Sequence, residues 1–166
     1  MSTTLNEKIT EMFREHADSL LRMSFLYLKD RHLAEDAVQE TFLNAYRNLE
    51  KFKGNSSEKT WLTRIAINAC KNIMRSPGYR HPHTELTEQI PDNSVDWLNT
   101  ERVSVSAEVG KLPLKYREAV LLYYYRELTT EETAKLLKVP RTTVEYRLRR
   151  AKTLLRKTLK ECYFNE

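Results

Sequence analysis

Side chains that can hydrogen-bond to the edges of DNA bases recur along one stretch near the C-terminal end. Arg141, Thr142, Glu145, Tyr146 and Arg149 are separated by steps of one, three, one and four residues, so a helix would place them on one side. Arginine can donate to both acceptors of guanine, glutamate can accept from the amine of cytosine, and threonine can contact the thymine methyl group. The pattern predicts a surface that reads duplex DNA in the major groove.

Further residues extend this surface and hold it in place. Cationic side chains beside it can contact phosphates: Arg147, Arg150 and Lys152. Thr129 or Thr130 can cap a preceding helix, and Pro140 suits the first turn of the next one. The apolar residues that would bury the second helix follow at steps of four, three and four: Val144, Leu148, Ala151 and Leu155. We predict a helix-turn-helix, and the alternative is a basic, solvated helix in an ordinary bundle.

A second stripe with nucleic-acid chemistry lies on a helix predicted over residues 59–75. Its members follow at steps of three, four, three and four: Trp61, Arg64, Asn68, Lys71 and Arg75. An aromatic ring among cations suits single-stranded nucleic acid, because bases stack on rings while phosphates contact the cations. The alternative is a tryptophan that belongs to the core beside ordinary surface charges.

An acidic and amide-bearing face is predicted on an earlier helix, over residues 33–52. Asp36, Gln39, Glu40 and Asn44 share it, together with Arg47. Charges on a helix face are most often only solvated. A more distant alternative is that Asp30, Glu35, Asp36 and Glu40 bind the metal ion of an enzyme.

The remaining pattern predicts an all-α protein with two small helical domains joined by a flexible linker. Helical periodicity covers residues 5–28, with a break suggested at 16–18, and returns at 105 before a helix over 116–126. Prolines keep residues 77–103 irregular. We therefore expect domains at 1–76 and 104–166, the second with the helix-turn-helix, and a linker at 77–103.

The charge distribution agrees with this division. Of the 166 residues, 28 are Lys or Arg and 23 are Asp or Glu, a net charge of +5. The two predicted domains are net basic and the segment between them is acidic, which indicates two surfaces that face nucleic acid. The sequence shows no signal peptide and no membrane-length apolar run, and its two cysteines, Cys70 and Cys162, give no disulfide framework or zinc motif. We expect a cytoplasmic protein without membrane insertion.

With both halves considered, the chain resembles the extracytoplasmic-function group of bacterial RNA polymerase sigma factors. Residues 30–42 resemble the helix of that family that binds core polymerase, and residues 60–68 resemble its promoter-melting helix. Leu112-Pro113, residues 116–120 and residues 143–151 resemble its C-terminal domain. Thr142 departs from the pattern, since the family often has glycine there, and the departure bears on the exact promoter sequence.

The resemblance implies a role for each surface. Asp36, Gln39, Glu40 and Asn44 would contact core RNA polymerase. The loop at 53–58 would hold a base flipped from the minus-ten element of melted promoter DNA, with a site formed by Lys53, Asn55, Ser56, Trp61, Arg64, Asn68 and Lys71. The minus-thirty-five element would be read in duplex form by Arg141, Thr142, Thr143, Glu145, Tyr146, Arg149 and Arg150.

The resemblance also implies a protein partner, an anti-sigma factor that masks these surfaces in a stress response. It implies no catalytic residue, no metal and no cofactor, and the sequence has no phosphate-binding glycine loop or nucleophile motif. The runner-up function is a conventional dimeric helix-turn-helix transcriptional regulator. Such a regulator would have no need for the stripe that begins at Trp61.

Overall fold

A computed structural model describes residues 2–79 and 100–164, and all their regular elements are helices. The chain divides into two compact units, residues 1–83 and 84–166. The exact domain and linker boundaries stay predictions, because residues 80–99 lie outside the described part. Helix α4 (Thr100–Lys111) includes the last four residues of the expected linker, 100–103.

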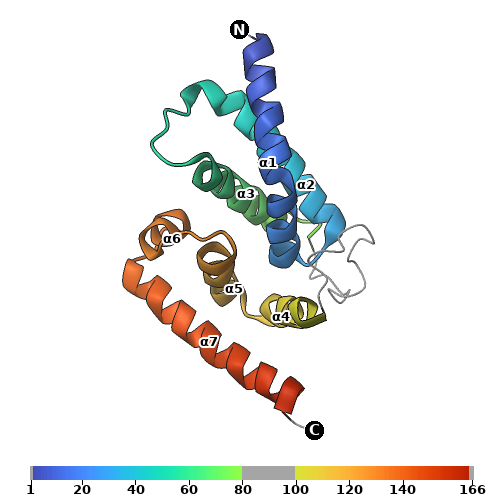
Figure 1. Cartoon of the computed structure of the whole chain (residues 1–166), viewed down its shortest axis with the longest axis vertical. Coiled ribbons are helices and arrows are strands. Elements are labelled where there is room, and N and C mark those ends of the chain that lie inside the picture. The colour runs from blue at the N-terminus through green and yellow to red at the C-terminus, as the bar shows by residue number, and fades with distance from the viewer. Residues whose placement is uncertain (1, 80–99, 165–166) are drawn as a thin grey trace. The chain divides into compact units, whose positions relative to one another are not determined.

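The N-terminal unit is built from three long helices (Figure 1). They are α1 (Ser2–Leu28), α2 (Arg31–Asn48) and α3 (Glu58–Arg75), and a short 3-10 turn, η1 (Leu49–Lys51), ends the second. Each helix packs on the other two. Helix α1 continues through residues 16–18, where the sequence suggested a break.

The apolar stripes of these helices meet in one core. Its fully buried members include Met12, Leu20, Met23 and Tyr27 from α1, Ala34, Ala37 and Ala45 from α2, and Leu62, Ala66, Ile67 and Cys70 from α3. Three of the six buried residues of α2 are alanines, and such small side chains allow the helix axes to approach closely. The core fixes the rotation of α2 and α3, and so decides which of their side chains face solvent.

Capping residues define where α2 and α3 begin. The Asp30 side chain accepts a hydrogen bond from the backbone N–H of Leu33 at 3.0 Å, so α2 starts at Arg31, two residues before the predicted start. The Ser57 hydroxyl accepts from the N–H of Thr60 at 3.1 Å and starts α3 at Glu58. In the loop between them, Gly54 has a φ of +74°, a backbone conformation that suits glycine.

The C-terminal unit ends in the predicted helix-turn-helix. Helix α5 (Leu114–Val120) and the π-helical turn η3 (Leu121–Tyr125) precede α6 (Thr130–Leu137) and the long α7 (Arg141–Phe164) (Figure 1). Ala119, Ala134, Val144 and Leu148 form a buried cluster that joins α5, α6 and α7. The predicted helix at 116–126 is therefore α5 continued by a wider turn.

Local chemistry sets the ends of α6. Thr129 and Glu132 form a reciprocal capping box: the N–H of Glu132 donates to the Thr129 hydroxyl at 3.0 Å, and the N–H of Thr129 donates to the Glu132 carboxylate at 3.2 Å. At the other end Lys138 adopts the left-handed conformation (φ 59°) and its N–H donates to the last carbonyls of α6. Pro140 then accepts from the N–H of Thr143 and Val144, and α7 begins.

Candidate nucleic-acid interface

The predicted reading face is exposed on the first turns of α7. Arg141, Thr142, Tyr146 and Arg149 are exposed and Glu145 is half-buried. The opposite side of the helix is anchored in the core, because Val144 and Ala151 are fully buried and Leu148 is 7% exposed. Of the two flanking members of the predicted site, Arg150 is exposed and Thr143 is half-buried. The fold thus holds this face outward on a rigid support.

Arg141 is already engaged within the protein. Its Nε donates to the Glu145 carboxylate at 3.0 Å, and its Nη1 lies 3.5 Å from a carboxylate oxygen of Glu131 on α6. These partners raise the pKa of Arg141, first through the hydrogen bond with Glu145 and then through the negative charges of both glutamates. A base or phosphate that takes Arg141 has to replace these contacts, and Glu145 is released at the same time.

The aromatic residue of the α3 stripe, Trp61, packs against a residue outside the helix. The Trp61 ring is half-buried and stacks on Phe52, with ring centroids 4.5 Å apart and an interplanar angle of 23°. Arg64 and Asn68 are exposed further along the helix, and Lys71 is half-buried. Trp61 therefore supports the loop between η1 and α3 as well as contributing to the exposed stripe.

That loop presents the other members of the predicted minus-ten site. Lys53 and Asn55 are exposed, and Ser56 is half-buried with its hydroxyl 3.4 Å from the carbonyl oxygen of Ser57. The loop is short and is held at both ends, by Phe52 on Trp61 and by the Ser57 cap. This arrangement places polar groups beside the N-terminal end of α3, where partial positive charge favours an anionic ligand.

The third predicted surface is an ordered polar row on α2. Asp36, Gln39 and Glu40 are exposed and Asn44 is half-buried. The Asn44 amide donates to Glu40 at 3.3 Å, and Arg47 donates to the Asn44 oxygen at 3.4 Å. Two of the residues named in the metal-enzyme alternative have structural partners instead: Asp30 caps α2, and Glu35 accepts from Arg31 at 3.0 Å.

Sequence patterns did not reveal the apolar groove beside this row. It has a volume of about 560 Å³ and lies between α1 and α2. Its lining residues are Asn6, Ile9, Thr10, Phe13, Gln39, Phe42, Leu43 and Tyr46. Two of its aromatic residues, Phe13 and Tyr46, are 50% and 45% exposed. Gln39 belongs to both the polar row and the groove, so the two form one continuous surface.

Comparisons with known proteins match the two halves of the chain to two different family descriptions. The family description "Sigma-70 region 2" matches residues 12–78, and "Sigma-70, region 4" matches residues 102–155. The ECF RNA polymerase sigma-E factor of Haemophilus influenzae is 32% identical over 134 residues, which are 72% of this chain and 71% of that protein. The ECF RNA polymerase sigma factor SigW of Bacillus subtilis is 32% identical over 160 residues, 88% and 86% of the two chains.

The chain belongs to the ECF RNA polymerase sigma factors.

Two solved structures share the fold of this sigma factor. CnrH in complex with the cytosolic domain of CnrY has a TM-score of 0.69 at 21% identity, covering 93% of this chain and 89% of that one. The sigma factor RpoE in complex with the anti-sigma factor NepR from Bartonella quintana has a TM-score of 0.67 at 22% identity, covering 90% and 97%. The region 2 match contains α2 and α3, and the region 4 match contains the helix-turn-helix.

As a sigma factor, the protein is a transcription initiation factor that acts with core RNA polymerase at promoters. The alternative of a conventional dimeric regulator is not favoured. None of the described helices is long and apolar enough to cross a membrane.

Proposed function

We propose that this ECF sigma factor uses three separate surfaces for the successive steps of initiation. The polar row Asp36-Gln39-Glu40-Asn44 on α2 binds core polymerase. The loop at 53–58 and the α3 stripe hold the melted minus-ten strand, and the first turns of α7 read the minus-thirty-five duplex. The observation that carries this assignment is the presence of two DNA-suited helix faces in different units, a layout that a single-site regulator does not need.

The chemistry of each surface suits its proposed DNA state. Helix α7 exposes paired donors and acceptors on a rigid cylinder, as major-groove reading requires. The α3 surface instead combines an anchored ring, an amide and cations, and an unstacked base can be held there by hydrogen bonds. Unstacking costs a few kcal/mol, and contacts to the freed base offset that cost.

An anti-sigma factor is the proposed regulator. Each of the two structural neighbours was solved in complex with another protein, and the partner of RpoE, NepR, is named an anti-sigma factor. A protein that covers the polar row and the adjoining groove would block polymerase binding by occupying the same surface. We place the protein in the cytoplasm, where its polymerase partner works, and assign it no catalytic role and no cofactor.

Core binding is tested by reversing charge on the polar row. The variant Asp36→Arg/Glu40→Arg should bind purified core polymerase more weakly, by about tenfold or more. Reversing two charges in a complementary interface places like charges opposite one another, which costs several kcal/mol. Both positions are exposed, so the fold should survive, and circular dichroism checks this. Glu50→Arg, an exposed position on η1 outside the row, is the control. Unchanged core affinity in the folded double variant would remove α2 from the proposed interface.

A further inference from the structure

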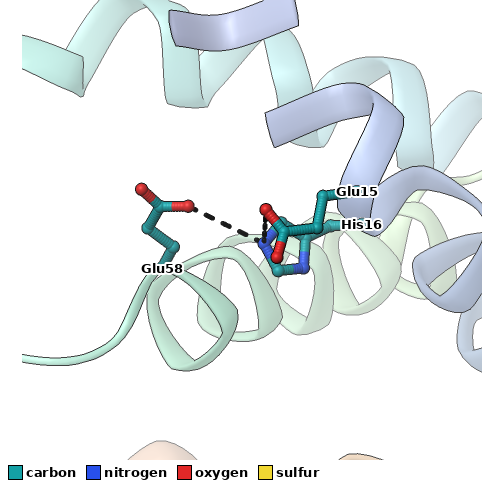
Figure 2. A group of neighbouring side chains, drawn as sticks. All are labelled: Glu15, His16 and Glu58. Atoms are coloured by element: carbon teal, nitrogen blue, oxygen red, sulfur yellow. Dashed lines mark ion pairs between the residues drawn. The ribbon is translucent and has the colours of Figure 1, made fainter. Parts of the chain in front are cut away.

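Three side chains that can ligate a metal ion converge where α1 meets the beginning of α3. Glu15 and His16 come from α1, and Glu58 is the first residue of α3 (Figure 2). One ligand atom from each lies within 4.8 Å of the others. The His16 Nε2 atom is 3.9 Å from a carboxylate oxygen of Glu15 and 3.8 Å from Glu58 Oε2. The site borders the proposed minus-ten surface, because Glu58 is the last residue of the loop at 53–58.

The His16 nitrogen has no hydrogen-bond partner among the described residues. Its side chain is only 12% exposed and Nε2 is buried. A buried polar atom without a partner is destabilising, so the position of His16 Nε2 between two carboxylates needs an explanation. A direct hydrogen bond would bring nitrogen and oxygen to about 2.9 Å. Ligand atoms around a tetrahedral metal ion lie roughly 3.4 Å apart, which is closer to the observed spacing.

Lys8 fixes the orientation of Glu58. Its Nζ is 2.6 Å from Glu58 Oε1, and this hydrogen bond and the carboxylate charge raise the pKa of Lys8. One carboxylate oxygen is thereby held by the lysine while Oε2 faces His16. Outer partners of this kind orient metal-binding carboxylates in known sites. The two glutamates also supply the negative charge that offsets a divalent cation.

We propose that Glu15, His16 and Glu58 bind a divalent transition-metal ion, with water in the remaining coordination positions. The imidazole nitrogen favours ions such as Zn²⁺ over Mg²⁺ and Ca²⁺, which prefer oxygen ligands. Glu15 is 71% exposed, so the ion is open to solvent and exchanges with it. A bound ion links α1 to the first turn of α3, next to the loop at 53–58, and stabilises the start of that helix.

Isothermal titration of the free, untagged full-length protein with ZnCl₂ at neutral pH tests the proposal. The reference protein carries His81→Gln, His83→Gln and Cys162→Ser, which remove other candidate ligands. It should bind one Zn²⁺ per chain and take up no Mg²⁺ at the same concentrations. His16→Gln should weaken Zn²⁺ binding at least about tenfold, because even the outer partners of metal ligands contribute that much. The control His32→Gln removes an exposed histidine of the same unit and should leave the affinity unchanged.

A second variant, Glu15→Gln, excludes the explanation that His16→Gln weakens Zn²⁺ binding only by disturbing the fold. The Glu15 side chain is exposed, so its substitution should weaken Zn²⁺ binding and leave the core intact. The proposal is overturned if the reference protein binds no Zn²⁺, or if Glu15→Gln binds it as tightly as the reference. Since binding is measured without polymerase or DNA, the result is independent of the proposed role in initiation.

Discussion

At the scale of single residues, the two arginines of the reading face are placed differently. Arg141 lies between Glu145 and Glu131, whose carboxylates must be displaced before it can contact DNA. Arg149 is exposed two turns further along α7, where its backbone carbonyl accepts from Thr153. Arg149 is therefore the simpler probe of base reading, since its removal does not release two internal carboxylates.

We expect Arg149→Ala to weaken binding of the polymerase holoenzyme to a duplex minus-thirty-five element. A bidentate arginine contact to a base contributes about 1–3 kcal/mol, so the affinity should fall by that amount. The loss should be smaller on templates altered at the contacted base pair, because that contact is already missing there. Lys157→Ala removes an exposed cation further along α7 and serves as the control. Equal losses on all templates would indicate a phosphate contact instead of base reading.

Cys70 provides a pH-dependent prediction in the core. Burial raises the pKa of its thiol from 9.0 to about 12, although the nearby Ser24 hydroxyl acts in the opposite direction. In the unfolded chain the thiol loses its proton near pH 9, while the folded protein retains it. The unfolded state therefore binds fewer protons between these values, and the free energy of unfolding should fall as pH rises from about 9 toward 12.

The measurement compares urea unfolding at pH 8 and pH 10 in two variants, Cys162→Ser and Cys70→Ala/Cys162→Ser. The variant that retains Cys70 should lose more stability over this interval, by at most about 1.4 kcal/mol per pH unit. Identical losses in the two variants would show that Cys70 is not shielded from water as the structure has it.

At the scale of elements, periodicity predicted most helices because each has a continuous apolar stripe. It did not predict the π-helical turn η3, where the N–H of Arg126 donates to the carbonyl of Leu121 at 2.9 Å, five residues back. The run Leu-Leu-Tyr-Tyr-Tyr contains no glycine or proline that would signal a change in the helix. The wider turn accompanies the burial of the next residue, Arg126, which is 2% exposed in the folded protein. Such packing is invisible to a pattern read along one helix.

The same limit applies to α1 and α2. Phe13 and Tyr46 continue apolar stripes, but the stripes are wider than the surface that the other helices cover, so a groove remains between them. The cluster of Glu15, His16 and Glu58 could not be predicted either, because its members come from distant parts of the sequence and meet only when α1 packs on α3.

The capping box of α6 gives a prediction about the helix-turn-helix. Thr129→Ala removes the hydroxyl that accepts from the Glu132 N–H, and the loss of such a cap costs about 0.5–2 kcal/mol. Thr130→Ala, one residue later and inside the helix, should cost less. Hydrogen exchange of the α6 amides in the full-length protein, measured at increasing urea concentrations, gives the stability cost of each substitution. Equal destabilisation by the two substitutions would mean that the cap contributes nothing specific.

At the scale of the whole molecule, the sequence predicted two helical domains with separate basic surfaces, and the structure has two compact units. The division matters because duplex and melted DNA demand different chemistry. One unit presents the helix face that we propose reads the duplex, and the other presents the loop and stripe that we propose hold an unstacked base. The central claim is that these surfaces act on different states of the same promoter.

The most direct test of that claim compares Asn68→Ala and Arg149→Ala in holoenzyme at a promoter, with permanganate footprinting for strand opening and nuclease protection for upstream binding. Asn68→Ala should retain upstream protection and lose opening, whereas Arg149→Ala should lose upstream protection. A template with a pre-melted minus-ten bubble should restore at least part of the open complex that Asn68→Ala loses, because the unstacking cost has been removed. The account is contradicted if both variants show the same footprint defects, or if the pre-melted bubble leaves the Asn68→Ala defect unchanged.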